Sequence, residues 1–160
     1  PTIAAILGPC VGGGLEIACA CDLRIAGAGA KFGAPIMKLG FSMYPGELAG
    51  VLRLAGSALA KEILLEGRLL SATEALAKGL LTRVVADDAL MAEAQATAGR
   101  IAAGAPLVAR WHKQWIARLL DGRPLTLEEK RASFAFLDSA DYAEGLAAFL
   151  EKRPPRFIGR

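Results

Sequence analysis

The chain has 160 residues, is 54% hydrophobic and carries a net charge of +3 at pH 7, which suits one domain or one core with a helical appendage. The charges are interspersed without a long basic run, so we do not expect nucleic-acid binding. Glycines, Pro9 and Glu16 interrupt the apolar stretch near the start, so we do not expect it to span a membrane. The hydrophobic excess predicts burial against a sister subunit or against a missing part of the chain's own fold.

The first two thirds of the chain are typical of a mixed α/β arrangement. The apolar run TIAAILG at 2–8 predicts a buried strand, and a strand with so little lead-in suggests the C-terminal piece of something longer. The elements expected next are a glycine turn and a short helix ending near Asp22, strands at 23–27 and 30–33, a loop at 35–45, helices at 46–56 and 57–67, a helix from Ser71 to Gly79, a strand at 81–85, and a helix from Asp87 or Asp88 to about Gly104.

No strand is expected after Gly104. Pro106 begins a predicted helix that continues to Leu120. The segments SATE at 71–74, TLEE at 126–129 and DYAE at 141–144 have the spacing of a capping box, which starts a helix. We therefore expect a mixed α/β region at 1–104 and a helical region at 105–160.

The triple glycine Gly12, Gly13 and Gly14 is the first candidate for chemistry. Without side chains, these residues let backbone N–H groups approach a ligand, and the first N–H groups of a helix lack partners and carry partial positive charge. Such groups suit a developing oxyanion, although close packing of helix and strand explains the glycines equally well. The spacing G-x-G-x-x-G of dinucleotide-binding turns is absent.

Glu16 is the only charged residue among the first twenty-one. A favourable interaction with the helix dipole would explain it, but its apolar neighbours predict shielding and a raised pKa, which suit general acid–base work. Glu47 is either a dipole partner at a helix start or a second active-site carboxylate. His112 lies beside the Trp111 and Trp115 stripe, where packing or exposure is the simpler interpretation.

The remaining candidates are the cysteines and the basic tail. Cys10, Cys19 and Cys21 are poorly spaced for a metal site and are interpreted as free thiols of a reducing cytoplasm, and no metal is expected. Lys152, Arg153, Arg156 and Arg160 concentrate charge in the tail, as a solvated terminus or as a contact with a phosphate-bearing ligand.

The stretch PTIAAILGPCVGGGLEIACACDLRIAGAGAKFGAP resembles the signature region of the crotonase superfamily, the enoyl-CoA hydratases and isomerases. The resemblance continues through RLAG at 53–56, LLEGRLLSATEALAKGLLTRVV and EGLAAFLEKRPPRF, and so covers essentially the whole chain. It implies an α/β fold, the C-terminal part of a crotonase-like spiral of ββα units, followed by a helical trimerisation region.

The resemblance also implies a site and partners. By motif match, Gly13 supplies one of two N–H groups that stabilise the enolate of an acyl-CoA thioester, and Glu16 acts as acid and base. Further candidates for substrate contact are Gly12, Pro35, Ile36, Phe149 and Lys152. No separate cofactor is expected, since coenzyme A belongs to the substrate, and the expected assembly is a cytoplasmic homotrimer or hexamer in acyl-CoA metabolism.

Two departures from the family pattern leave alternatives open. The family's N-terminal part, with the second oxyanion N–H, has no counterpart here. Family hydratases also carry a second glutamate after the proline of F-G-x-P, where this chain has Ile36. Hydration by two glutamates is therefore in question. Four alternatives remain open. Glu16 either shifts a proton alone or acts together with Glu47. Otherwise the chain catalyses another crotonase-type reaction, such as thioester hydrolysis or decarboxylation, or is a degenerate paralogue that binds or assembles without turnover.

Overall fold

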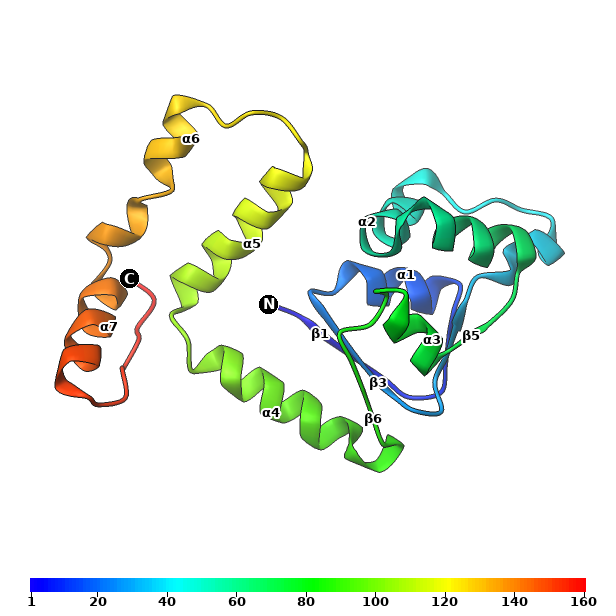
Figure 1. Cartoon of the computed structure of the whole chain (residues 1–160), viewed down its shortest axis with the longest axis horizontal. Coiled ribbons are helices and arrows are strands. Elements are labelled where there is room, and N and C mark those ends of the chain that lie inside the picture. The colour runs from blue at the N-terminus through cyan, green and yellow to red at the C-terminus, as the bar shows by residue number, and fades with distance from the viewer. The chain divides into compact units, whose positions relative to one another are not determined.

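The computed structural model describes residues 1–160, which form two compact units (Figure 1). One comprises Thr2–Thr97 and the other comprises Ala98–Arg160 together with Pro1. The division falls inside helix α4, Leu90–Ala102, rather than at Gly104, where the sequence changes character.

Two small sheets form the α/β unit. The first has the order β1-β3-β6 and is parallel, and the second has the order β2-β4-β5, with β2 parallel and β5 antiparallel to β4. The strands are β1 (Ile3–Ile6), β2 (Pro9–Val11), β3 (Leu23–Gly27), β4 (Lys31–Gly33), β5 (Leu70–Ser71) and β6 (Arg83–Val85). The pairs β1–β2 and β3–β4 each send one strand to each sheet and are followed by a helix, which is the expected ββα repeat.

Helices follow the strands of this unit in chain order. They are α1 (Gly13–Ala20), the 3₁₀ helix η1 (Pro35–Leu39), α2 (Pro45–Lys61), the π-helical turn η2 (Glu62–Glu66), α3 (Ala72–Ala77), the 3₁₀ turn η3 (Asp87–Ala89) and the start of α4. Gly56 interrupts α2 with φ 73° and ψ 174°, where the sequence predicts the boundary between two helices. The loop expected at 35–45 begins instead with η1, because Pro35 supplies a suitable first residue.

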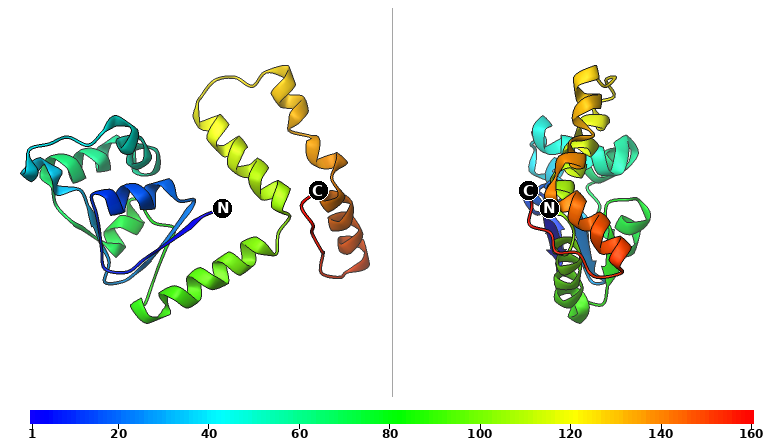
Figure 2. Two further views of the ribbon diagram at one scale, coloured as in Figure 1. Left: turned by 180° about the vertical axis from the view of Figure 1, so that it is seen from behind. Right: turned by 90° about the vertical axis from the view of Figure 1, so that its left-hand side faces the viewer.

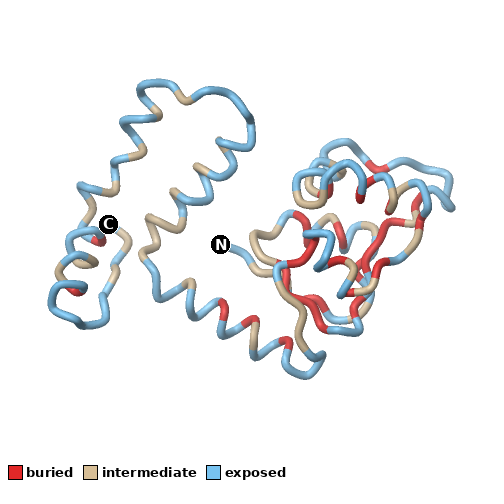
Figure 3. The backbone as a smooth tube through the Cα atoms, in the orientation of Figure 1, coloured by how far each residue is buried: buried red, intermediate tan, exposed pale blue.

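The core of the α/β unit lies between its sheets and helices, where Figure 3 shows most of the buried backbone. Phe32, Leu15, Ile63 and Leu70 are among the largest buried side chains of its main cluster. Ile25 of β3 belongs to a second, smaller cluster with two residues of α4. Strand β3 is buried at every residue after Leu23, whereas β1, which the sequence predicts to be a buried strand, exposes Ala5 and is buried only at Ile6.

The helical unit contains α5 (Pro106–Leu120), α6 (Leu127–Ala132), the 3₁₀ turn η4 (Ala135–Asp138) and α7 (Ala140–Glu151). The residues after α7 fold back along this helix, as the two views of Figure 2 agree. Only Asp141 and Ala148 are buried in this unit. None of the helices of the chain combines the length and the apolar character needed to cross a membrane.

The capping boxes of SATE and TLEE are confirmed: Ser71 pairs with Glu74, and Thr126 pairs with Glu129. The capping box predicted for DYAE is wrong. Ser139 caps α7, with its hydroxyl accepting the N–H of Tyr142 at 3.1 Å. Asp141 instead lies inside the helix, where its carboxylate accepts the N–H groups of Ile158 and Gly159.

Candidate functional site

The turn at Gly12 leaves backbone N–H groups at the start of α1 without hydrogen-bond acceptors. Gly12 has φ 54° and ψ −125°, a conformation open to glycine, and its carbonyl accepts the N–H groups of Leu15 and Glu16 at 2.9 and 3.2 Å. The N–H groups of Gly13 and Gly14 have no acceptor within the chain. A side chain at Gly14 would meet open space, so an anionic oxygen can reach these donors.

Glu16 lies in the first turn of α1 and is half-buried. Its Oε2 is 3.9 Å from the place where a Cβ on Gly13 would lie, so the carboxylate extends along the free end of the helix. Burial raises the pKa of Glu16, and the negative charge of Glu47 raises it further. The apolar neighbours of Glu16 in the sequence predict the effect of burial, whereas the effect of Glu47 comes from another helix, α2.

Glu47 occupies the first turn of α2, is exposed, and accepts the N–H of Tyr44 at 3.3 Å. It therefore serves the start of its own helix, as the simpler of its two interpretations predicts. The close packing of the two helices brings it toward Glu16: a Cβ on Gly50 of α2 would lie 3.3 Å from the Cβ of Cys19. The fold thus brings both candidate carboxylates into one electrostatic environment.

Pro35 and Ile36 begin η1. Ile36 is 9% exposed and belongs to the wall of a hollow of about 390 Å³. The wall consists of Ile36, Met37, Gly40, Phe41, Ser42, Met43, Leu48, Leu64 and Leu65, so Ser42 contributes its one polar side chain. Leu48 follows Glu47 in the chain, and the hollow therefore adjoins the start of α2.

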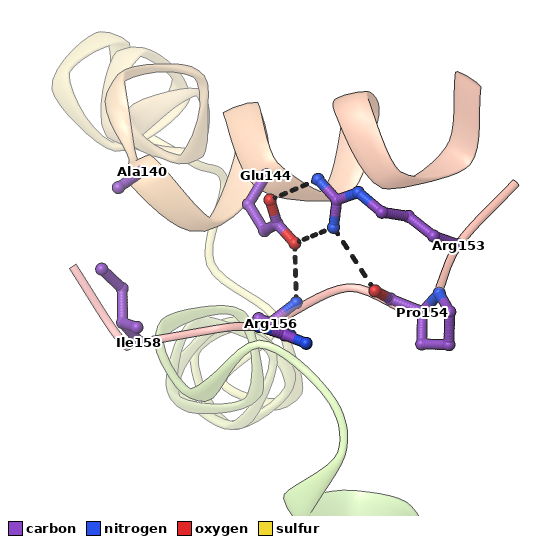
Figure 4. Close-up of a pocket in the computed structure, with 6 residues that line it drawn as sticks. All are labelled: Ala140, Glu144, Arg153, Pro154, Arg156 and Ile158. Atoms are coloured by element: carbon purple, nitrogen blue, oxygen red, sulfur yellow. Dashed lines mark hydrogen bonds and ion pairs between the residues drawn. The ribbon is translucent and has the colours of Figure 1, made fainter. Parts of the chain in front are cut away.

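The two tail candidates belong to the helical unit. Phe149 is 80% exposed, and Lys152 ends α7 with φ 55° and an exposed side chain. Figure 4 shows a neighbouring hollow of about 670 Å³, where the Glu144 carboxylate binds the Arg153 guanidinium at 2.6 and 2.9 Å and the Arg156 N–H at 2.7 Å. Arg153 is therefore engaged by its own chain, which leaves Lys152 and the side chains of Arg156 and Arg160 as candidates for a phosphate contact.

The other candidates do not assemble into a site. No three His, Cys, Asp or Glu residues lie together as metal ligands would. Cys10 and Cys19 are buried free thiols, and burial raises the pKa of Cys19 to about 11. His112 is exposed and lines a hollow of α5 with Trp111 and Trp115.

Arg24 is a buried charged residue that the sequence interpretation did not consider. The available signal was a lone arginine within LRIAG, an otherwise apolar strand between apolar elements. A charge in such a strand indicates a specific buried partner.

Comparison with known proteins gives consistent results. The profile of the enoyl-CoA hydratase/isomerase family matches residues 1–160. A probable enoyl-CoA hydratase of Mycobacterium bovis is 41% identical over 162 residues, which cover 100% of this chain and 63% of that protein. A crotonyl-CoA hydratase of Syntrophomonas wolfei is 37% identical over 164 residues, covering 100% of the chain and 62% of that protein.

Among solved structures, an enoyl-CoA hydratase/carnithine racemase from Magnetospirillum magneticum matches with a TM-score of 0.95 and 56% identity. The match covers 100% of this chain and 60% of that one. The chain therefore spans 60–63% of the length of these relatives. These matches confirm the predicted family and the prediction that the chain corresponds to a part of that family's fold.

Proposed function

Because the chain belongs to the enoyl-CoA hydratase/isomerase family, we propose that it acts on an acyl-CoA thioester through an enolate held at the start of α1. The observation that carries the proposal is the pair of free N–H groups on Gly13 and Gly14 with the Glu16 carboxylate beside them. Donors fixed in the fold stabilise charge that develops on the thioester oxygen without reorganising during the reaction. Coenzyme A enters as part of the substrate.

Glu16 is the proposed acid and base. When a proton leaves C2 of a 3-enoyl thioester, the electrons move into the carbonyl and an enolate forms at the Gly13 N–H. The protonated Glu16 then returns the proton at C4, which leaves the double bond between C2 and C3. Its raised pKa suits the removal of the C2 proton, because a carboxylate of higher pKa binds the proton more readily.

Ile36 favours this double-bond shift over hydration. Hydration needs one group to activate water and another to protonate carbon, and the aliphatic side chain of Ile36 does neither. The wall to which Ile36 belongs has Ser42 as its one polar side chain, so it offers a water molecule few polar partners. One carboxylate is sufficient for the proton shift.

Hydration with Glu47 as the second group is the other candidate. The negative charge of Glu47, which raises the pKa of Glu16, supports it, because two carboxylates that interact can serve one site as acid and base. Incubating the full-length protein with a 3-enoyl-CoA and with a 2-enoyl-CoA in D₂O distinguishes the two reactions. A product that gains no water and has its double bond at C2–C3, with at most one deuterium taken up at C4, supports the shift, and addition of D₂O supports hydration.

The variant Glu16→Gln tests the proposal in the full-length protein. We expect turnover to be abolished and acyl-CoA binding, measured by calorimetry, to be nearly intact. Glu128→Gln is the matched control, because Glu128 is exposed on α6. Unchanged turnover in Glu16→Gln would contradict the role of Glu16, whereas acyl-CoA binding without turnover on any enoyl-CoA would support a degenerate paralogue.

A further inference from the structure

Arg24 of β3 connects three elements of the α/β unit. It is 6% exposed and forms no ion pair. Its Nε donates to the Leu80 carbonyl at 2.8 Å, and its Nη1 donates to the Cys21 carbonyl at 2.6 Å. Cys21 is the C-terminal cap of α1, so the guanidinium links the end of this helix to the segment before β6.

The backbone of Arg24 is fixed as firmly as its side chain. Its N–H donates to Thr82 Oγ1 at 3.1 Å, and its carbonyl accepts the Thr82 N–H at 2.9 Å. These bonds lie in a parallel sheet where β3 pairs with both β1 and β6. The guanidinium is therefore a rigid support for whatever it binds.

A buried cation without a carboxylate requires another source of compensation, because removing the charge from water is costly. The carbonyls at the C-terminal end of α1 provide partial negative charge, and Cys21 contributes the carbonyl that Nη1 contacts. The planar fork of arginine spans two carbonyls in different segments, whereas the ammonium of a lysine is a compact single point. The site thus favours arginine specifically.

We propose that Arg24 is a positioning residue that anchors the C-terminal end of α1 and thereby sets the Gly13 N–H and the Glu16 carboxylate. The inference rests on the proposed function of those two groups. A helix of this length spans about 12 Å. Tilting it by about 5° around its anchored end would move its first N–H by ~1 Å, and misplacement of that size can lower a rate by about 10²-fold.

The test compares Arg24→Lys and Arg24→Ala in the full chain with Arg83→Gln as control. Arg83 lies on the adjoining strand β6 and pairs with Glu93. We expect kcat of the Arg24 variants to fall about 10- to 100-fold with KM changed less than about threefold, because binding groups stay while the reacting groups move. Ethylguanidinium should partly restore kcat of Arg24→Ala, and Arg83→Gln should retain kcat.

Hydrogen exchange provides a readout that does not depend on turnover. In Arg24→Lys, which keeps the charge and most of the volume, we expect faster exchange of the α1 amides than in the unmodified chain, while the β1 and β3 amides exchange at unchanged rates. Unchanged exchange in α1, or kcat within twofold of the unmodified chain, overturns the inference. If the unmodified chain turns over no enoyl-CoA but exchange still accelerates in α1 alone, the proposed function fails and the anchor is supported.

Discussion

Glu16 owes its raised pKa to two causes that a single substitution separates. Burial acts first and the Glu47 charge acts second. In Glu47→Gln the second cause is gone, so the pKa of Glu16 falls toward its ordinary value while remaining above it. Carbon-detected NMR titration of the Glu16 carboxyl measures the change, with Glu128→Gln as a control expected to leave the titration unaltered. A titration unchanged by Glu47→Gln would contradict the electrostatic link.

Gly12 is required by its backbone conformation. We expect Gly12→Ala to lower the free energy of unfolding by about 1–3 kcal/mol, because a side chain is strained at φ 54° and ψ −125°. Urea denaturation of the two proteins measures this loss. Gly14→Ala is the matched control: it lies within α1, at ordinary φ and in open space, so it should preserve or slightly raise stability. Equal losses in both variants would show that the Gly12 conformation is not the cause.

The sequence identifies some residues of the site and misassigns others for physical reasons. Glu16 and Gly13 are recognisable because a lone carboxylate and a glycine turn stand out in an apolar stretch. Glu47 acts on Glu16 only because α1 and α2 pack together, which local spacing does not reveal. Asp141 has the spacing of a helix cap, but the returning tail offers its carboxylate three hydrogen bonds that it cannot make as a cap.

At the scale of elements, long periodic segments were predicted better than short ones. The helices α5 and α4 and the strand β3 lie close to their expected ranges. The sequence predicts neither the two-residue strand β5, which exists only by pairing with β4, nor β2, which lies between the predicted strand at 2–8 and the glycine turn. Such elements are defined by partners distant in the chain, so hydrophobic periodicity carries little information about them.

The capped start of α6 makes stability depend on pH. Glu129 has its pKa lowered from 4.5 to about 2 by the Arg118 side chain and then by the N–H of Thr126. A lowered pKa in the folded state means that the stabilisation is complete above 4.5 and is lost as the pH falls toward 2. We therefore expect the melting temperature to fall less steeply over this range in Glu129→Gln than in the unmodified chain. Parallel curves from calorimetric scans at several pH values would contradict the assignment.

At the scale of the whole molecule, the two units differ in how much they bury. The α/β unit has a continuous apolar cluster, whereas the helical unit buries only Asp141 and Ala148 (Figure 3). Ion pairs such as Arg118 with Glu129 and Arg153 with Glu144 connect the helical segments instead. Since partly exposed ion pairs contribute little stability, the helical unit requires another apolar surface to cover it.

Helix α5 is where that requirement is clearest. It has no buried residue, and Ile116 and Leu120 are 62% and 61% exposed at positions that share one face. Further copies of the chain would cover this face in the expected trimer or hexamer. We predict by light scattering after gel filtration that the full chain has three or six times the mass of its monomer, and that Ile116→Lys and Leu120→Lys reduce the mass. Gln114→Lys, on an exposed polar position of the same helix, should preserve the assembly. A monomer in the unmodified chain would contradict the assembly, and an undiminished mass in both apolar variants would exclude this face as its interface.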